Sequence, residues 1–432
     1  MTGDDGGWQR GSYNPGAVEL RPFRSIRYSR ATIAERGLAS LIAPPPDRDT
    51  AAAGAPPAPG NIVRLTSAED PEAAAASLKN WLGGGILDKE RRPGLWSYRQ
   101  TFVHEGATLV RDALVGLVRL AEPSKDRLLR LEEQDPVARE RPLALLRSLK
   151  ADFTPVLLLT RAPLTGRLAT TRRPDLTALD SSGVRHDAYR ITDFAAHVEL
   201  QGLVKNAEAI LAEGEDLFEA ALEYSKDPAA VKFGGAKYKL CALVDAESPA
   251  LVVRPVHRLL SGLSDWNPAH LVYAASDFFE TREFPSTAEA LAALHDLSRL
   301  SPAFALVAPP AKPTLFVLRD RPDALPWPED RSEAWRQLDV AAIDVALLSR
   351  LLAAEPATLA RDGKLTFTTD TAAALAAVEK GDAQAAILLR PMPFSEIETI
   401  ARSGEPLPRR AATFHPKLFA GLFGFSLEDP VY

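Results

Sequence analysis

The sequence predicts a mixed α/β (α+β) protein, and three observations lead to this class. Segments typical of strands and segments typical of helices alternate along most of the chain. Of the 432 residues, 46% are apolar and 25% are charged, which is ordinary for a globular protein with a substantial core. The length suits two or three domains, and we find neither an internal repeat nor a long heptad pattern.

The first half begins with residues 1–17, which are acidic and rich in glycine and are expected to form a disordered tail. Glu69–Leu82 has the composition of a helix and is followed by a run of glycines that would end it. Leu95–Phe102 and Thr108–Leu120 are expected to form a strand pair, with His104–Gly106 in the connecting turn.

The middle of the chain is dominated by helical composition. Ser124–Lys150 contains Pro136 and Pro142, so we predict two or three short helices rather than one. Thr154–Thr160 is the best candidate for a buried strand. The stretch Lys205–Tyr224, KNAEAILAEGEDLFEAALEY, is predicted as a single helix with a glycine in its middle.

The second half alternates between the two kinds of element. We predict helices over Thr287–Leu300, Ser332–Ala354, Thr371–Lys380 and Ser395–Ser403, and strands over Leu240–Val244, Leu251–Val253, Phe304–Val307, Thr314–Leu318, Leu365–Thr368 and Gln384–Leu389. This organisation predicts a main α/β domain over residues 18–265 and a C-terminal α/β region, residues 266–432, packed on it.

Composition excludes several classes of function. The formal net charge of −6 argues against a general nucleic-acid binder. The single cysteine, Cys241, lies in an apolar run and is interpreted as a small buried hydrophobic residue, and the scattered histidines give no spacing for structural zinc. No stretch reaches the ~18 apolar residues that a membrane helix needs, and no secretion signal is visible. We therefore expect a cytoplasmic protein without a membrane segment.

Seven segments resemble, in their order and spacing, those of a known family. They are RPFRSIRY (Arg21–Tyr28), APPPD (Ala43–Asp47), GNIVRL (Gly60–Leu65), LWSYRQTF (Leu95–Phe102), ERPLALLRSLKADFTPVLLL (Glu140–Leu159), RPVHRLL (Arg254–Leu260) and GEPLPRRAATFHPKLFAGL (Gly404–Leu422). Together they resemble the family known as domain of unknown function 1015, which is distantly similar to free-serine kinases with a ParB-like fold. The resemblance implies a ParB-like, serine-kinase-like N-terminal part and a smaller C-terminal α/β part.

Two polar motifs of that family are altered in this chain. Where the family has His-Glu-Arg/Lys-Thr, Leu131–Gln134 reads LEEQ and keeps only Glu132. Where the family has Asp-Gly-His-His-Arg, Glu213–Leu217 reads EGEDL and keeps only Gly214 and an acid before it. The residues that follow this motif, Phe218–Leu222, resemble the family's sequence again. The scaffold is preserved better than the polar motifs, so we expect catalysis to be lost or altered.

A phosphoryl-transfer site needs cations or backbone N–H donors around the phosphates, usually with a metal and a base. The family's His-His-Arg would place cations at a helix start, whereas this chain has Glu215, Asp216 and Leu217 there. Glu215, Glu219 and Glu223 recur at every fourth position, so a solvated acidic face is the favoured interpretation.

The alternative interpretation of these acids is a metal site. Carboxylates repel a phosphate unless a divalent cation lies between them. Since Mg²⁺ prefers oxygen ligands, Glu213 and Asp216 are the candidate metal ligands, with Mg²⁺ arriving together with a nucleotide.

The resemblance also suggests catalytic and ligand-binding residues elsewhere. Glu132 is the candidate general base or metal ligand, and Asp47, which follows three prolines, keeps the family's acid and is the second catalytic candidate. The ligand-binding candidates are the residues kept from the family or its basic turns, namely Gly214, His257, Arg258, Arg410 and Lys417. For each of these residues, a structural or solvent-facing role is the alternative.

Three functions follow from these observations. The preferred one is a protein that binds a nucleotide or small metabolite and whose catalysis is lost or altered, because cations are missing from the motif. The second is a small-molecule kinase similar to free-serine kinases, using ATP or ADP. The third, a ParB-like protein associated with DNA, is disfavoured by the acidic net charge.

Overall fold

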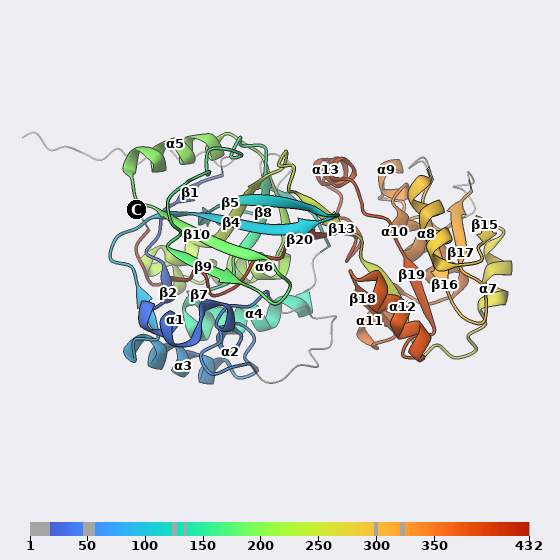
Figure 1. The fold of residues 1–432 in the computed structure, drawn as a ribbon, viewed down its shortest axis with the longest axis horizontal. Coiled ribbons are helices and arrows are strands. Elements are labelled where there is room, and N and C mark those ends of the chain that lie inside the picture. The colour runs from blue at the N-terminus through green and yellow to red at the C-terminus, as the bar shows by residue number, and fades with distance from the viewer. Residues whose placement is uncertain are drawn as a thin grey trace, which may run out of the picture.

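The computed structural model describes residues 18–45, 57–122, 128–133, 136–297, 301–319 and 325–431, and it confirms the mixed α+β class. The predicted tail over residues 1–17 and the candidate Asp47 lie outside these ranges. Two large sheets organise the described chain, and Figure 1 shows them side by side, each with its own helices.

The first sheet contains nine of the described strands. Across the sheet they are β6 (Leu128–Arg130), β11 (Ala209–Glu213), β8 (Val156–Thr160), β12 (Tyr238–Asp245), β5 (Ala107–Arg119), β4 (Leu95–His104), β10 (Arg185–Ile191) and β9 (Leu176–Leu179), with β1 (Leu20–Arg21) paired to β5. The pairs β6–β11 and β8–β12 are parallel, and the other neighbours are antiparallel. The predicted pair of strands over residues 95–120 is confirmed as the β4–β5 hairpin.

Both faces of this sheet are buried, and the central strand β12 shows why. Leu240, Ala242 and Val244 belong to one hydrophobic cluster, whereas Cys241 and Leu243 belong to another. Because successive side chains of a strand point to opposite faces, such an apolar run needs cover on both sides. The prediction that Cys241 is a buried hydrophobic residue is confirmed.

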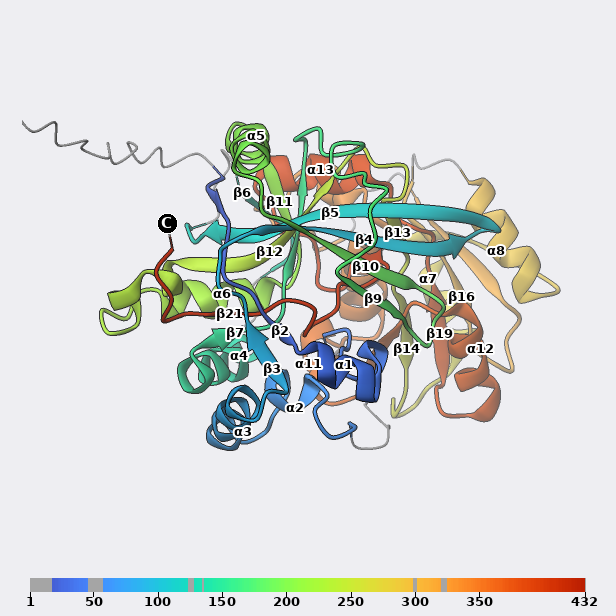
Figure 2. The ribbon, with the colours of Figure 1, turned by 60° about the vertical axis from the view of Figure 1, so that its left-hand side comes forward.

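Helices provide that cover. Those of the first part are α1 (Arg30–Arg36), α2 (Val63–Thr66), α3 (Pro71–Gly83), α4 (Pro136–Leu149), α5 (Phe194–Lys205) and α6 (Glu215–Tyr224). Figures 1 and 2 show α5 on one side of the sheet and α3 and α4 on the other. Helix α6 packs against α4 and against strands β8 and β12.

The second sheet has six described strands. Across the sheet they are β15 (Phe279–Glu283), β17 (Thr314–Leu318), β16 (Ala303–Val307), β19 (Ala385–Leu388), β14 (His257–Leu260) and β18 (Leu365–Thr368). Its helices are α7 (Pro268–Ala275), α8 (Thr287–Asp296), α9 (Glu333–Arg336), α10 (Asp339–Ala342), the π-helical segment η5 (Ile343–Leu351), α11 (Pro356–Arg361), α12 (Thr371–Lys380) and α13 (Phe394–Ser403). None of the described helices combines the length and the apolar composition required to cross a membrane.

The C-terminal segment leaves the second sheet and returns to the first part. Strand β20 (Thr413–His415) pairs with β13 (Val252–Arg254), and β21 (Phe425–Ser426) pairs with β7 (Ala151–Asp152). A third small pair joins β2 (Ile26–Tyr28) and β3 (Leu87–Lys89). The predicted domain division at residue 265 stays a prediction. In the structure, β13 is the last strand before the chain enters the second sheet, which it does at β14.

The predicted single helix over Lys205–Tyr224 is wrong. Helix α5 ends at Lys205, the buried strand β11 follows, and only α6 is helical. Alanine, leucine and isoleucine in β11 fill a gap between β6 and β8, so burial in the sheet overrides the helix propensity of Ala and Leu. Gly214 makes the turn from β11 into α6 at φ 90°, in the left-handed region.

Two other helix predictions need correction. The described residues between 124 and 150 contain strand β6 and one helix, α4, rather than several short helices, and Pro142 lies inside α4. A proline inside a helix costs about 3 kcal/mol, and the burial of Ala138, Leu145 and Leu146 offsets that cost. The predicted helix over Ser332–Ala354 is divided into α9, α10 and η5.

The turn at Gly214 provides a direct test of this local fold. A Cβ atom at Gly214 would lie 2.7 Å from Val156 Cγ1, in addition to the strain of its positive φ. Gly381, which ends α12 at φ 79°, has open space around a Cβ. We expect Gly381→Ala to lower the free energy of unfolding by about 1 kcal/mol through backbone strain alone. Gly214→Ala should lower it by about 3 kcal/mol because overpacking adds to the strain.

Urea unfolding of the two variants beside the wild type measures the difference. Equal losses for the two glycines would contradict the close approach of Val156 to Gly214.

Candidate functional site

The candidate site lies where two parallel strands of the first sheet end together. Leu211 of β11 pairs with Arg130 of β6, so the residues that follow these strands meet at one edge. Leu129 and Leu131 are buried in the core. Arg130 and Glu132 alternate with them along the chain, so they point to the opposite face. The altered motif around Glu132 and the altered motif around Glu213 therefore lie next to each other.

The acids at the start of α6 are not a solvated face. Glu215 and Glu219 both form ion pairs with Arg130, and the Arg130–Glu219 contact measures 2.5 Å. The Glu219 residue is only 8% exposed. Burial raises the pKa of Glu215 to about 8, against the attraction of Arg130. The favoured interpretation from the sequence is therefore wrong for these two acids, because both side chains are largely buried against Arg130 instead of facing water.

Glu213 connects the end of β11 to the C-terminal segment. Its Oε1 accepts hydrogen bonds from Lys417 Nζ at 2.5 Å, from the backbone N–H of Phe414 at 2.9 Å and from Thr413 Oγ1 at 3.0 Å. Hydrogen bonds between charged partners are stronger than neutral ones. This carboxylate therefore fixes residues 413–417 beside the sheet edge.

Glu132 is surrounded by charge from the same segment. The backbone of Leu407 donates to the carbonyl of Leu131 at 2.7 Å, so the chain before Arg409 runs alongside Glu132. Burial raises the pKa of the half-buried Glu132 to about 7, against the attraction of the nearby Arg410, Arg409 and Lys417. A carboxyl with a pKa near 7 can hold or release a proton under ordinary conditions.

The second sheet contributes Arg258, on strand β14. This side chain is 1% exposed, and its Nε atom lies 3.9 Å from Oδ1 of Asp344 in η5. Its Nη1 donates to the carbonyl of Val256 at 3.0 Å, whereas Nε makes no hydrogen bond. Burial lowers the pKa of Arg258, and the charges of Asp344 and Glu132 oppose that shift. The charge of Glu132 therefore acts on a side chain of the second sheet.

We refer to these side chains as the charged cluster, which comprises Arg130, Glu132, Glu213, Glu215, Arg258, Arg409, Arg410 and Lys417. Of the residues predicted from sequence, the structure brings Glu132, Glu213, Arg258, Arg410 and Lys417 into the cluster, and it places Gly214 in its backbone. Asp216 is close enough for its charge to act on Glu215. The role of each residue in binding or catalysis stays a prediction.

His257 faces a different environment from its neighbour Arg258. Its Nδ1 accepts the backbone N–H of Leu389 at 3.1 Å, and its Nε2 lies 2.8 Å from Thr371 Oγ1. Burial lowers its pKa to about 4, assisted by the charge of Arg258. These contacts hold β14, β19 and α12 together, which is a structural role.

The residues present do not fit a metal held by the protein. Glu213 is bound to Lys417, and Glu215 is bound to Arg130. Within the described ranges, no group of three or more His, Cys, Asp or Glu side chains is placed to hold a metal ion. The structure therefore gives no support to Glu213 and Asp216 as Mg²⁺ ligands.

Sequence reasoning missed Arg130 and Asp344. Arg130 lies two residues before Glu132, and the alternation of Leu129 and Leu131 with Arg130 and Glu132 was the available signal. Asp344 had no local signal, because only the packing of η5 brings it near Arg258. Burial raises its pKa to about 6, against the attraction of Arg258.

Comparison with known proteins gives a family and distant structural likenesses. A free serine kinase in complex with AMP aligns with 13% identity over 70% of this chain and 86% of its own, with a TM-score of 0.37. A conserved hypothetical protein from Pyrococcus furiosus aligns with 12% identity over 73% of this chain and 96% of its own, with a TM-score of 0.38. SbnI with a C-terminal truncation, from Staphylococcus aureus, aligns with 10% identity over 71% of this chain and 85% of its own, with a TM-score of 0.34.

No curated protein matches the sequence. The family described as "Protein of unknown function (DUF1015)" matches residues 20–341, about three quarters of the chain. This protein therefore belongs to the DUF1015 family.

Proposed function

We propose that the protein binds a nucleotide, or another small molecule that carries phosphate, at the charged cluster. The observation that carries this proposal is the meeting of cations from distant segments. Arg258 comes from the second sheet, whereas Arg409, Arg410 and Lys417 come from the C-terminal segment, and all four act on or near Glu132. Cations gathered from separate elements give the positive potential that a phosphate needs.

The backbone at the same place supports an anion. Helix α6 begins at Glu215, and its N-cap residue, Gly214, has no side chain that could cap it. The N-terminal end of a helix also carries positive partial charge. Glu215 would oppose an anion there, but Arg130 is paired with this carboxyl.

The same geometry supports altered rather than preserved catalysis. The family's His-His-Arg positions hold Glu215, Asp216 and Leu217, so α6 itself presents no cation to a phosphate. The cations of the charged cluster belong instead to β6, β14 and the C-terminal segment. A phosphate bound by these groups would have a different position relative to Glu132 than a phosphate bound at the start of α6. Phosphoryl transfer depends on how the phosphate is positioned against the catalytic groups.

A second function, phosphoryl transfer to a small hydroxyl compound, is supported by Glu132 alone. A half-buried carboxyl with a pKa near 7 is suited to accept a proton from an attacking hydroxyl. Nucleotide binding accompanied by release of phosphate, or by phosphorylation of free serine, would favour this function over binding alone.

Calorimetric titration of the protein with AMP, ADP and ATP, with and without Mg²⁺, tests the proposed binding. We expect Lys417→Met to weaken ADP binding roughly tenfold, because one charge-assisted hydrogen bond is worth about 1.5 kcal/mol. Lys226→Met is the matched control, since Lys226 follows the far end of α6 and pairs with Glu122 and Glu223 there. If no nucleotide gives heat, or if both variants lose affinity equally, the proposal fails.

The protonation of Glu132 can be tested separately through stability. Its folded pKa of about 7 lies above the ordinary value of 4.5, so its contribution to stability is full below about pH 4.5 and is lost as the pH rises through 7. In Glu132→Gln, this loss cannot occur. We therefore expect the variant to be more stable than wild type at pH 8, by about 3 kcal/mol, and by less than about 1 kcal/mol at pH 5.

Urea unfolding at the two pH values measures this difference. A variant that is less stable than wild type by the same amount at both pH values would show that Glu132 is ionised and satisfied in the folded protein.

A further inference from the structure

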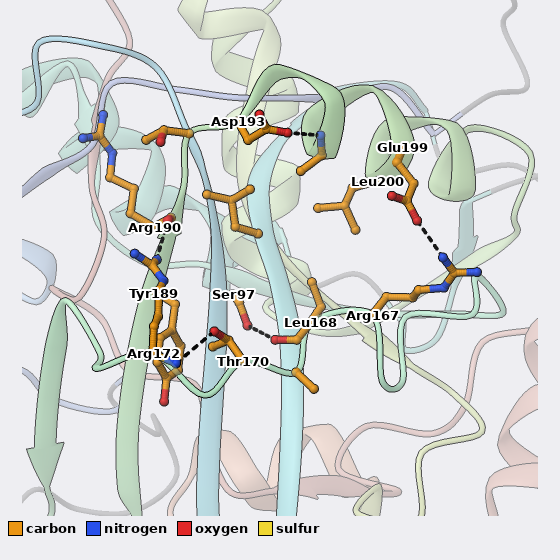
Figure 3. Close-up of a pocket in the computed structure, with 14 residues that line it drawn as sticks. Ser97, Arg167, Leu168, Thr170, Arg172, Tyr189, Arg190, Asp193, Glu199 and Leu200 are labelled. Carbon is orange, nitrogen blue, oxygen red and sulfur yellow. Dashed lines mark hydrogen bonds and ion pairs between the residues drawn. The ribbon is translucent and has the colours of Figure 1, made fainter.

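A cavity of about 350 Å³ lies far from the charged cluster along the first sheet. It is lined by β10, by the start of α5 and by residues 167–172, whereas the charged cluster adjoins β6 at the opposite end of the strand order. Its volume falls within the range of small-molecule pockets. We refer to it as the α5 pocket, and Figure 3 shows the residues around it.

The floor of the α5 pocket is apolar and fixed. Leu168 and Leu200 are each 4% exposed and belong to the same hydrophobic cluster, with Ile191 packed against it. The hydroxyl of Ser97 donates a hydrogen bond to the carbonyl of Leu168 at 3.2 Å, which holds the floor to strand β4. An apolar group placed here would be removed from water at no cost in reorganising the floor.

The two walls carry opposite charge. One wall is a loop that carries Arg167 and Arg172 (Figure 3). The other wall is α5, with Asp193 as its N-cap residue and Glu199 in its first half. An ion pair between Arg167 and Glu199, at 2.7 Å, joins the walls at the rim. Their side chains are 57% and 54% exposed, so the pair contributes little stability and a ligand can replace it.

Both walls retain unused polar groups. Nη2 of Arg172 donates to Asp175 Oδ2 at 3.1 Å and to the carbonyl of Arg190 at 2.5 Å, which fixes the guanidinium beside the ring of Tyr189. The Nε and Nη1 atoms of Arg172 make no hydrogen bond within the described part of the chain. Asp193 caps α5 by accepting the N–H of Ala196 on Oδ2 at 2.8 Å, and no described group donates to its Oδ1.

We propose that the α5 pocket binds a small zwitterion with an apolar body, of the class of α-amino acids with apolar side chains. The carboxylate binds Arg167, because a guanidinium pairs well with a carboxylate. The ammonium binds Glu199, so that the ligand replaces the ion pair between Arg167 and Glu199, and the side chain covers Leu168 and Leu200. A ligand with both charges pairs with both walls, whereas a simple anion at Arg167 would leave Glu199 without a cation.

Calorimetric titration of the full chain tests the ligand class. We expect L-leucine and L-phenylalanine to bind. N-acetyl-L-leucine lacks the ammonium, and L-leucinamide lacks the carboxylate. Each should bind at least roughly tenfold more weakly than L-leucine, because each loses one charged contact with the pocket. The absence of binding by both amino acids, or equal binding of either analogue, would overturn the proposal.

Variants locate the binding. Arg167→Gln and Glu199→Gln remove charge from opposite walls at exposed positions, so both variants should fold, and each should weaken L-leucine binding roughly tenfold. Arg361→Gln is the matched control, since its side chain is 75% exposed on α11 in the second part of the chain. Unchanged affinity in both wall variants, with unchanged melting temperatures, would show that an amino acid binds elsewhere and would also overturn the assignment.

Discussion

The charged cluster depends on the carboxylate of Glu213. This single oxygen, Oε1, accepts hydrogen bonds from Lys417, Phe414 and Thr413, so it holds the C-terminal segment against the end of β11. The segment enters the first part beside Glu132 through the contact of Leu407 with Leu131. Between these two attachments lie Arg409 and Arg410. The positive charge around Glu132 therefore exists because an acid kept from the family's motif is used as an anchor.

The cations of the charged cluster come from elements other than α6. At the start of α6 lie Glu215 and Asp216, which alone would make the site acidic. Arg130 then pairs with Glu215, and Arg258 approaches Glu132 from the second sheet. The resulting cluster mixes paired acids with cations from distant segments.

The sequence predicted elements whose signals are local. The helix over Thr371–Lys380 is confirmed as α12, because Asp370 caps its start and Gly381 ends it. The buried strand in Thr154–Thr160 is confirmed as β8 by its run of apolar residues. The helix predicted over Lys205–Tyr224 failed because the residues of β11 have high helix propensity, and only their neighbours in the sheet decide their conformation.

The sequence could identify residues of the charged cluster, but it could not predict which charged side chains pair with each other. Glu132, Glu213 and Lys417 could be named from motifs, since each lies in a segment that resembles the family. That Glu213 would bind Lys417, across 204 residues of chain, follows from tertiary structure alone. The α5 pocket had no sequence signal at all, because its walls come from a loop and a helix that neither motif contains.

The most direct test of the account is the position of a bound phosphate. A crystal structure of the protein with ADP should place the phosphates beside Lys417 and Arg410, next to the first turn of α6. Phosphates bound at any other place, or a charged cluster left empty at saturating ADP, would contradict the claim that relocated cations form the binding site.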